Sequence, residues 1–292
     1  MIDLHFHSTK SDGTVTPKEL AILGKKQGLS AMALTDHDTL SGVEEFIGAA
    51  TELGIRAISG LELSADVTGK TVHLLAYGVD INDGPLNEAL VKIRNGRKIR
   101  NNEILAKLTK HGCFITMSEV MEFAGDKDLI ARPHIAAALI KKGYASSKND
   151  AFARYLGRGG IAYVDRFRLT PAEAINLIHS AGGIVSLAHP YQIGFSPFEL
   201  NEFIAELVNL GLDGIETYYP HHTYDMLNNY KAQCYKHNVI PTGGSDFHGE
   251  NTINIKLGVG VGNLNVPDSS FDSILDRINL RKKYKSYLSE SI

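Results

Sequence analysis

Nine residues of the types that bind metal ions lie at or just after short apolar runs spread over most of the chain. They comprise six histidines and three acidic residues: His5, His7, Asp12, His37, Glu62, His73, His189, Asp246 and His248. Histidines and carboxylates seldom gather in such numbers without a cation to bind. A fold that brings the ends of these apolar runs together would form a metal site. The alternative is a set of hydrogen-bonded polar residues on a barrel rim.

The spacing of two residue pairs supports the metal interpretation. Alternate residues of an extended segment point to the same side, so His5 and His7 can bind one ion together. Asp246 and His248 repeat this spacing near the other end of the chain. Either pair alone is a weak signal, but two pairs with four more candidates between them form a strong one.

Strand and helix signals alternate on both sides of the middle of the chain. We expect about seven strands, near residues 2–5, 31–35, 55–59, 72–79, 184–188, 214–217 and 239–242. Helices between them, such as those starting at Thr16-Pro17 and Thr170-Pro171, predict parallel β/α units. Parallel β/α barrels carry their chemistry at the C-terminal strand ends, where His5, His37, Glu62, His189 and Asp246 fall. His73 lies near the start of its run, which predicts an antiparallel or irregular strand.

The middle of the chain has a different character. Residues 86–112 have helical spacing and carry a basic stretch from Arg94 to Arg100. Helix or loop signals continue to about Arg168, so we predict a mainly helical insertion at 86–168 within a barrel domain of residues 1–85 and 169–292. The basic stretch could guide an RNA strand, or it could be a solvated helix face.

Composition excludes several classes of function. The net charge of −3 gives no global positive field for nucleic acid or anionic membranes. Cys113 and Cys234 are far apart and suit a reducing compartment. No secretory signal or apolar stretch of about 20 residues is present. We therefore expect a cytoplasmic protein without a membrane or an obligate protein partner.

The motifs together resemble those of the PHP (polymerase and histidinol phosphatase) superfamily of metal-dependent phosphoesterases. The resemblance covers residues 1–80 and 170–265, and it includes His5-Phe6-His7-Ser8, Thr35-Asp36-His37-Asp38, Ala188-His189-Pro190 and Gly244-Ser245-Asp246-Phe247-His248-Gly249. It implies an α/β fold, a distorted (β/α)7-type PHP barrel with the mainly helical insertion. The Ala131-Arg132-Pro133-His134 segment is similar to the branch that hydrolyses nucleoside 3′,5′-bisphosphates and trims 5′-phosphorylated short RNA.

The resemblance also implies two or three divalent ions, with Mn²⁺ favoured and Fe²⁺ or Zn²⁺ as alternatives. His5, His7, Glu62 and Asp246 would hold the first ion. Asp12, His37 and His248 would hold the second, while Glu62, His73 and His189 would hold the third. Mixed nitrogen and oxygen ligands suit these metals better than Mg²⁺.

We expect a metal-activated hydroxide to attack the phosphorus of a small phosphorylated nucleotide, with 5′-phosphorylated RNA as a further substrate. A histidinol-phosphate phosphatase and a non-catalytic metal-binding PHP module are the alternatives.

Three further residues are candidates for substrate contacts. Arg132 could bind a substrate phosphate or form an ion pair within the insertion. His134 could contact the phosphate, act as a general acid, compete with His189 as a ligand, or cap a helix. His222, beside Tyr218, Tyr219 and His221, could reach a base or a phosphate, or pack on the rim. Asp36 and Asp38 are expected to orient His37.

Overall fold

The computed structural model describes residues 1–67, 70–124 and 130–290. Within these ranges, eight strands form two sheets. The first sheet is parallel, in the order β1 (Ile2–Asp3), β2 (Ala31–Ala33) and β3 (Arg56–Ile58). The second has the order β4 (Gly60–Val67), β5 (Lys70–Tyr77), β6 (Ile184–Leu187), β7 (Gly214–Tyr218) and β8 (Ile240–Gly243).

The two sheets join into a distorted barrel. At one junction the Leu4 N–H donates to Gly243 O over 3.2 Å, and Phe6 pairs with Phe247. At the other junction His37 pairs with Glu62 in a parallel bridge. The distorted α/β barrel expected from the sequence is therefore confirmed.

One strand was missed, and with it the position of Glu62. Glu62 does not follow the third strand; it lies inside β4, which forms an antiparallel hairpin with β5. The alternation of apolar and polar residues from Leu61 to Val67 is a strand signal that could have revealed β4. The expectation for His73 is confirmed, since β5 is antiparallel to both of its neighbours.

Five helices accompany the strands: α1 (Pro17–Lys26), α2 (Val43–Glu52), α7 (Pro171–Ser180), α8 (Pro197–Asn209) and α9 (Tyr224–His237). The predicted starts of α1 and α7 are correct. Thr16 and Thr170 each accept from the backbone of a glutamate three residues later, and a proline follows each cap. Short 3₁₀ turns follow two site strands, at Pro190–Ile193 and Gly249–Asn251.

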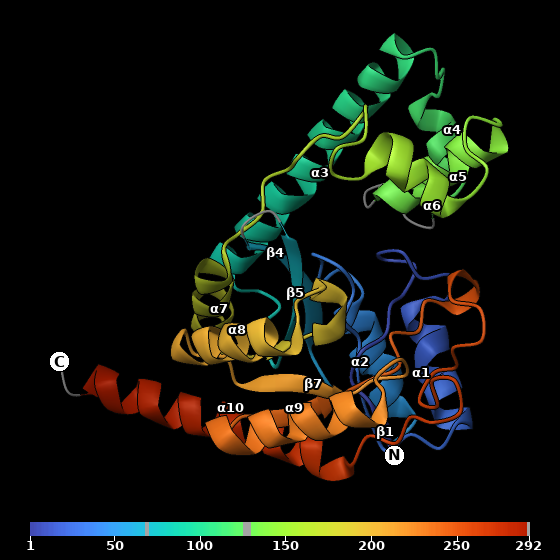
Figure 1. Ribbon diagram of the computed structural model, residues 1–292. Helices are drawn as coiled ribbons and strands as arrows, with labels where there is room; N and C mark the ends of the chain where they lie inside the picture. The colour runs from blue at the N-terminus through green and yellow to red at the C-terminus, as the bar shows by residue number, and fades with distance from the viewer. Residues whose placement is uncertain (68–69, 125–129, 291–292) are drawn as a thin grey trace.

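Among the described residues of the insertion, every regular element is a helix. The helices are α3 (Gly84–Lys110), α4 (Met117–Met121), α5 (Arg132–Lys141), α6 (Lys148–Ala151) and a π-helix (Phe152–Leu156). Leu86 and Leu90 of α3 pack in the barrel core, whereas Ile104 and Leu108 pack in a separate hydrophobic cluster with α4–α6. Figure 1 shows α3 running from the sheet out to this helical group. The division at residues 85/86 and 168/169 stays a prediction.

The C-terminal helix α10 (Asp268–Glu290) was not anticipated from the sequence. Phe271, Ile274 and Ile278 are buried against β-strand residues, and Figure 1 shows α10 at the edge of the molecule far from α4–α6. In the described part of the chain, no helix is both long enough and apolar enough to span a bilayer.

Candidate metal centre

All nine sequence-predicted residues converge at one end of the barrel, and we call them the histidine–carboxylate cluster. His5, His37, His189 and Asp246 follow β1, β2, β6 and β8, as expected for the C-terminal ends of parallel strands. Glu62 and His73 reach the same place from the β4–β5 hairpin.

Glu62 lies at the centre of this cluster and is completely buried. Its Oε2 lies 3.0 Å from His37 Nδ1, 3.2 Å from His7 Nε2 and 3.4 Å from His5 Nε2. Its Oε1 lies 2.7 Å from His73 Nδ1 and 3.0 Å from His189 Nε2. Five imidazoles thus surround one carboxylate, which is the arrangement expected of a bridging ligand.

Two further carboxylates complete the cluster. Asp246 Oδ1 lies 3.4 Å from His5 Nε2 and 3.3 Å from His7 Nε2. Asp12 Oδ1 lies 3.3 Å from His248 Nε2, and Asp12 Oδ2 lies 3.8 Å from His37 Nε2.

Four overlapping groups have ligand atoms close enough to share an ion. They are His7-Asp12-His37-His248, His5-His189-Asp246, His5-His7-Glu62 and His37-Glu62-His73. The sequence predicted that Asp12, His37 and His248 would hold the second ion. The structure groups these three residues and adds His7 to them. His189 groups with His5 and Asp246, whereas the sequence paired it with Glu62 and His73.

The unpaired atoms of the cluster fit divalent cations. His5 Nε2, His7 Nε2, His37 Nδ1, Asp12 Oδ1 and Glu62 Oε2 are buried without a hydrogen-bond partner among the described residues. Although burial alone would lower it, the nearby carboxylates of Asp246 and Glu62 raise the pKa of His7 to about 10. Bound cations would replace such protons, because ligating imidazoles must be neutral.

Glu216 holds two members of the cluster in place and was missed in the sequence. One of its carboxylate oxygens lies 2.8 Å from His5 Nδ1, and the other accepts from the His189 backbone N–H over 2.6 Å. The first contact directs His5 Nε2 toward the cluster, as carboxylate partners of metal-binding histidines do. The signal available in the sequence was a glutamate within the apolar run that forms β7, and the structure shows this glutamate to be fully buried.

Asp36 and Asp38 do not orient His37, contrary to our expectation. Asp36 accepts hydrogen bonds from Ser8 and Ser11 and so fixes the loop after β1. Asp38 accepts from the Ser64 N–H and pairs with Arg97. His37 instead faces Glu62 and Asp12, and the flanking aspartates position its neighbours.

The backbone of the cluster is strained where the chain turns at strand ends. His189 and Asp246 have φ values of 23° and 54°, in a region that costs most residues free energy. Gly244 lies so close to β1 that a Cβ there would be 2.3 Å from His5 N. Glycine is therefore required at position 244 to bring Asp246 next to His5.

The three predicted substrate residues lie in different places. Arg132 lines the cavity beside the cluster, and its Nη1 donates to Leu156 O over 3.3 Å. His134 is in none of the four ligand groups, and its Nδ1 accepts from the Ala131 N–H, which matches the helix-cap alternative. His222 lines a separate cavity with Tyr218 and Tyr219, and its Nδ1 donates to Thr217 O over 3.0 Å.

The cavity beside the cluster has a strongly basic wall. It has a volume of about 270 Å³ and is lined by Asp12, His37 and His73 together with five arginines. We call these arginines the arginine wall: Arg97, Arg100, Arg132, Arg166 and Arg168. Arg97 and Arg100 are buried in the wall, so the solvated-face alternative is wrong for these two residues.

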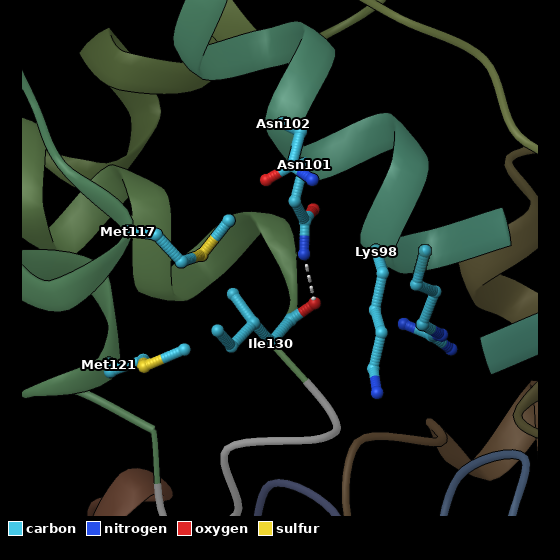
Figure 2. A pocket seen from close by; sticks show the side chains of 7 residues that line it. Lys98, Asn101, Asn102, Met117, Met121 and Ile130 are labelled. Atoms are coloured by element: carbon cyan, nitrogen blue, oxygen red, sulfur yellow. Dashed lines mark hydrogen bonds between the residues drawn. The ribbon is translucent and has the colours of Figure 1, made fainter. Parts of the chain in front are cut away.

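A groove adjoins the arginine wall through Arg97, which lines both spaces. Figure 2 shows Met117 and Met121 facing Ile130 across this groove, with Lys98 and Asn102 on the side of α3. Asn101 Nδ2 donates to Ile130 O over 2.8 Å, which ties α3 to the segment before α5.

Comparison with known proteins agrees with this architecture. The sequence profile of the PHP domain matches residues 3–149. A 3′,5′-nucleoside bisphosphate phosphatase from Chromobacterium violaceum is 31% identical over 85% of this chain and 87% of its own length. A 5′-3′ exoribonuclease from Haemophilus influenzae is 33% identical over 84% of this chain and 89% of its own length.

Two solved structures are also similar to this chain. An amidohydrolase from Chromobacterium violaceum, solved with bound sulfate and no metal, superimposes with a TM-score of 0.81 and 29% identity over 96% of both chains. A proposed metal-dependent phosphoesterase from Bifidobacterium adolescentis has a TM-score of 0.81 and 30% identity over 94% of this chain and 96% of its own.

Proposed function

The chain belongs to the PHP domain family, and from that premise we propose a metal-dependent phosphoesterase that hydrolyses the 3′-phosphate of nucleoside 3′,5′-bisphosphates. One observation carries this proposal: nine histidine and acidic side chains converge at one end of the barrel. Several of their ligand atoms are buried without a hydrogen-bond partner among the described residues. The name of the bisphosphate phosphatase from Chromobacterium violaceum supports the choice of substrate.

The histidine–carboxylate cluster would hold two or three divalent ions, for which Mn²⁺ is our first choice and Fe²⁺ or Zn²⁺ the alternatives. Divalent ions bound there would supply Lewis acidity and a nucleophilic water at neutral pH. Glu62 would bridge ions, since its two oxygens face different histidines. Glu216 would position His5 through its contact with His5 Nδ1. Tyr219 would position Asp246, because its O–H donates to Asp246 Oδ2 over 2.8 Å.

Arg132 is our candidate for a phosphate contact, because it shares the cavity with Asp12, His37 and His73. His134 is the weaker candidate for a general acid. Its Nδ1 is engaged in the cap of α5, so only Nε2 could serve a leaving group. His222 lies in the neighbouring cavity and would meet only a distal part of a substrate.

A second activity, 5′-3′ exonuclease on short 5′-phosphorylated RNA, is supported by the names of relatives from Haemophilus influenzae and Escherichia coli. Histidinol-phosphate hydrolysis and a non-catalytic role have no such support from these names. The cytoplasmic location predicted from the sequence also remains a proposal.

The test compares three substrates with one protein preparation. Protein reconstituted separately with Mn²⁺, Fe²⁺ or Zn²⁺ is given adenosine 3′,5′-bisphosphate, 5′-phosphorylated RNA and histidinol phosphate, and phosphate and nucleotide release are measured. We expect the bisphosphate to react fastest. Faster hydrolysis of histidinol phosphate would replace our proposal with that alternative, and bound metal without hydrolysis of any ester would favour the non-catalytic module.

A further inference from the structure

Three of the cavities in the described part of the chain border the histidine–carboxylate cluster, and they differ in charge and lining. The difference bears on RNA, because RNA and a nucleoside bisphosphate differ at the scissile phosphate. In the bisphosphate that phosphate ends the molecule, whereas in RNA it also esterifies the next nucleoside. An enzyme that hydrolyses both kinds of substrate needs a place for this extra nucleoside beside the cluster.

Two of these cavities have charges that do not suit a second nucleoside. One is the cavity with the arginine wall, which offers charge for phosphate groups. Another lies beside Phe247 and contains the carboxylates of Glu19 and Glu250. These acidic side chains would repel the phosphodiester backbone of a strand that continued past them.

The third cavity, which we call the aromatic cavity, has a lining that suits a nucleobase. It has a volume of about 350 Å³ and lies where β7 ends and α9 begins. Its rings belong to Tyr218, Tyr219, His222 and Tyr224. Of the described residues that line it, none is acidic. Aromatic rings stack on the face of any base, and such rings are typical of sites for single-stranded nucleic acid.

Tyr219 joins the aromatic cavity to the cluster. Its O–H donates to Asp246 Oδ2 over 2.8 Å, and the centroid of its ring lies 5.7 Å from that of the His189 ring. The same centroid lies 5.1 Å from that of His222 in the cavity lining. The aromatic cavity therefore begins one side chain away from a predicted metal ligand, on the Asp246 side of the cluster.

Polar groups around the aromatic cavity match the edge and the backbone of a nucleotide. Asn263 and Asn265 line it with exposed amides, which can pair with the edge of a base. His222 donates through Nδ1 to a backbone carbonyl, so Nε2 is an acceptor, and it is buried without a partner among the described residues. Lys231 Nζ lies 5.2 Å from the centroid of the Tyr218 ring and brings a positive charge to this edge.

We propose that the aromatic cavity binds the base of the nucleoside that follows the scissile phosphate in RNA. This inference rests on the proposed function, specifically on its 5′-3′ exonuclease activity, and deepens it by locating the second nucleotide. The cluster would hold the phosphodiester while Tyr224 and His222 contact the base. Because every base has an aromatic face, the site would show little sequence preference. A nucleoside bisphosphate carries no group that would occupy it.

The test compares adenosine 3′,5′-bisphosphate with the 5′-phosphorylated dinucleotide pApA, which differ only in the second nucleoside. The variants of Mn²⁺-loaded protein are Tyr224→Ala, Tyr224→Phe and Tyr235→Ala. Tyr224 is 76% exposed at the first position of α9, so its substitution leaves the core intact. Tyr235→Ala is the matched control, because Tyr235 is an exposed residue of the same helix and does not line the cavity.

We expect Tyr224→Ala to lower kcat/KM for pApA by about tenfold, mainly through KM, and to leave the bisphosphate within about twofold. Tyr224→Phe keeps the ring and should stay within about threefold of wild type on pApA. Tyr235→Ala should match wild type on both substrates. The inference is overturned if Tyr224→Ala changes both substrates equally or changes neither, or if Tyr224→Phe loses as much as Tyr224→Ala.

Failure of the proposed function has a different result. Wild-type protein that cleaves the bisphosphate but not pApA lacks the exonuclease activity, and pApA is then measured as an inhibitor of bisphosphate hydrolysis. Wild-type protein that cleaves neither is measured by calorimetric binding of both compounds. In either case, weaker binding of pApA to Tyr224→Ala than to wild type supports the inference, and equal binding rejects it.

Discussion

Three residues of the histidine–carboxylate cluster, Asp12, His37 and His73, line one cavity with the arginine wall, but the unpaired atoms of the cluster and of the wall have opposite character. Within the part of the chain that the structure describes, the cluster has buried ligand atoms without a hydrogen-bond partner, including His5 Nε2 and Glu62 Oε2. The wall has buried N–H donors, Arg166 Nη1 and Arg168 Nε, that find no acceptor in the same ranges. One side is suited to cations and the other to anions, so a phosphorylated substrate bound between metal ions and guanidinium groups would satisfy both.

This comparison also separates the effects of mutations. Damage to the cluster should slow every substrate by the same factor, because each substrate presents a phosphate to the same ions. Damage to the wall should change the preference between substrates. The following predictions test the cluster side of this contrast with two nucleotides, adenosine 3′,5′-bisphosphate and adenosine 3′-monophosphate.

Removal of the metal ions should have the largest effect. His5→Ala removes an imidazole and Asp246→Asn removes a carboxylate charge, and each of these groups faces two others of the cluster. Chelation of the wild-type protein removes the ions directly. We expect kcat/KM to fall by about 10³-fold or more on both nucleotides, with loss of bound metal in elemental analysis. His111→Ala, an exposed histidine on the insertion, is the control. Full turnover in either cluster variant would show that the residue is not a ligand.

Substitution of Glu216 should have the next largest effect. Glu216→Gln keeps the shape of the side chain but removes the charge that faces His5 Nδ1 and weakens the contact with the His189 N–H. We expect a loss of about 10- to 100-fold in metal affinity or in kcat/KM, equal for both nucleotides. Glu206→Gln on the exposed side of α8 should change neither quantity. A change in substrate preference without loss of metal would show that Glu216 does not position the metal ligands.

Tyr219→Phe should have a smaller effect of the same kind. It removes the O–H that donates to Asp246 Oδ2 over 2.8 Å, while the ring can keep its place beside His189. The loss of one hydrogen bond to a charged group predicts a decrease of about tenfold in kcat/KM on both nucleotides. Tyr235→Phe, at a side chain that is 93% exposed, controls for the loss of a hydroxyl. Unchanged kinetics would mean that Asp246 needs no help from Tyr219.

The two regions also differ in how far the sequence predicts them. Six of the nine cluster residues occupy positions that the backbone repeats, either alternate residues of an extended segment or the end of a strand: His5, His7, His37, His189, Asp246 and His248. Glu62 was assigned to the cluster but to the wrong element, since only Ser59 separates β3 from β4 and the two strands look like one in the sequence.

The arginine wall has no comparable repeat. Arg97 and Arg100 look like part of a solvated helix face, and only the packing of α3 against the barrel and the return segment buries them. Arg166 and Arg168 lie in an irregular segment whose path depends on the folded insertion. Contacts set by tertiary packing leave little periodic signal in the sequence.

A third charged cluster, centred on Asp213, differs from both regions because the chain itself supplies its counter-charges. Its substitution should have the smallest effect on activity. Asp213 contacts His179 over 2.9 Å, Arg281 over 2.7 Å and Arg277 over 3.4 Å, and it joins α10 to the barrel. Although burial alone would raise it, hydrogen bonds with His179 and Arg281 hold the pKa of Asp213 below its usual value. No ligand is needed for this cluster, so it should affect stability and not substrate preference.

Asp213→Asn should therefore lower the free energy of unfolding by about 1–2 kcal/mol at neutral pH and leave kcat/KM for both nucleotides unchanged. A carboxylate whose pKa is depressed by folding contributes stability above its unfolded pKa of about 3.9, and that contribution disappears as the pH falls through the folded pKa. Denaturant unfolding of metal-free wild-type and Asp213→Asn protein should thus show a difference that is constant above about pH 5 and shrinks below about pH 4. Because the cluster titrates equally in both proteins, it cancels in this difference. A difference that grows toward acid pH would contradict the assignment of the effect to the Asp213 carboxylate.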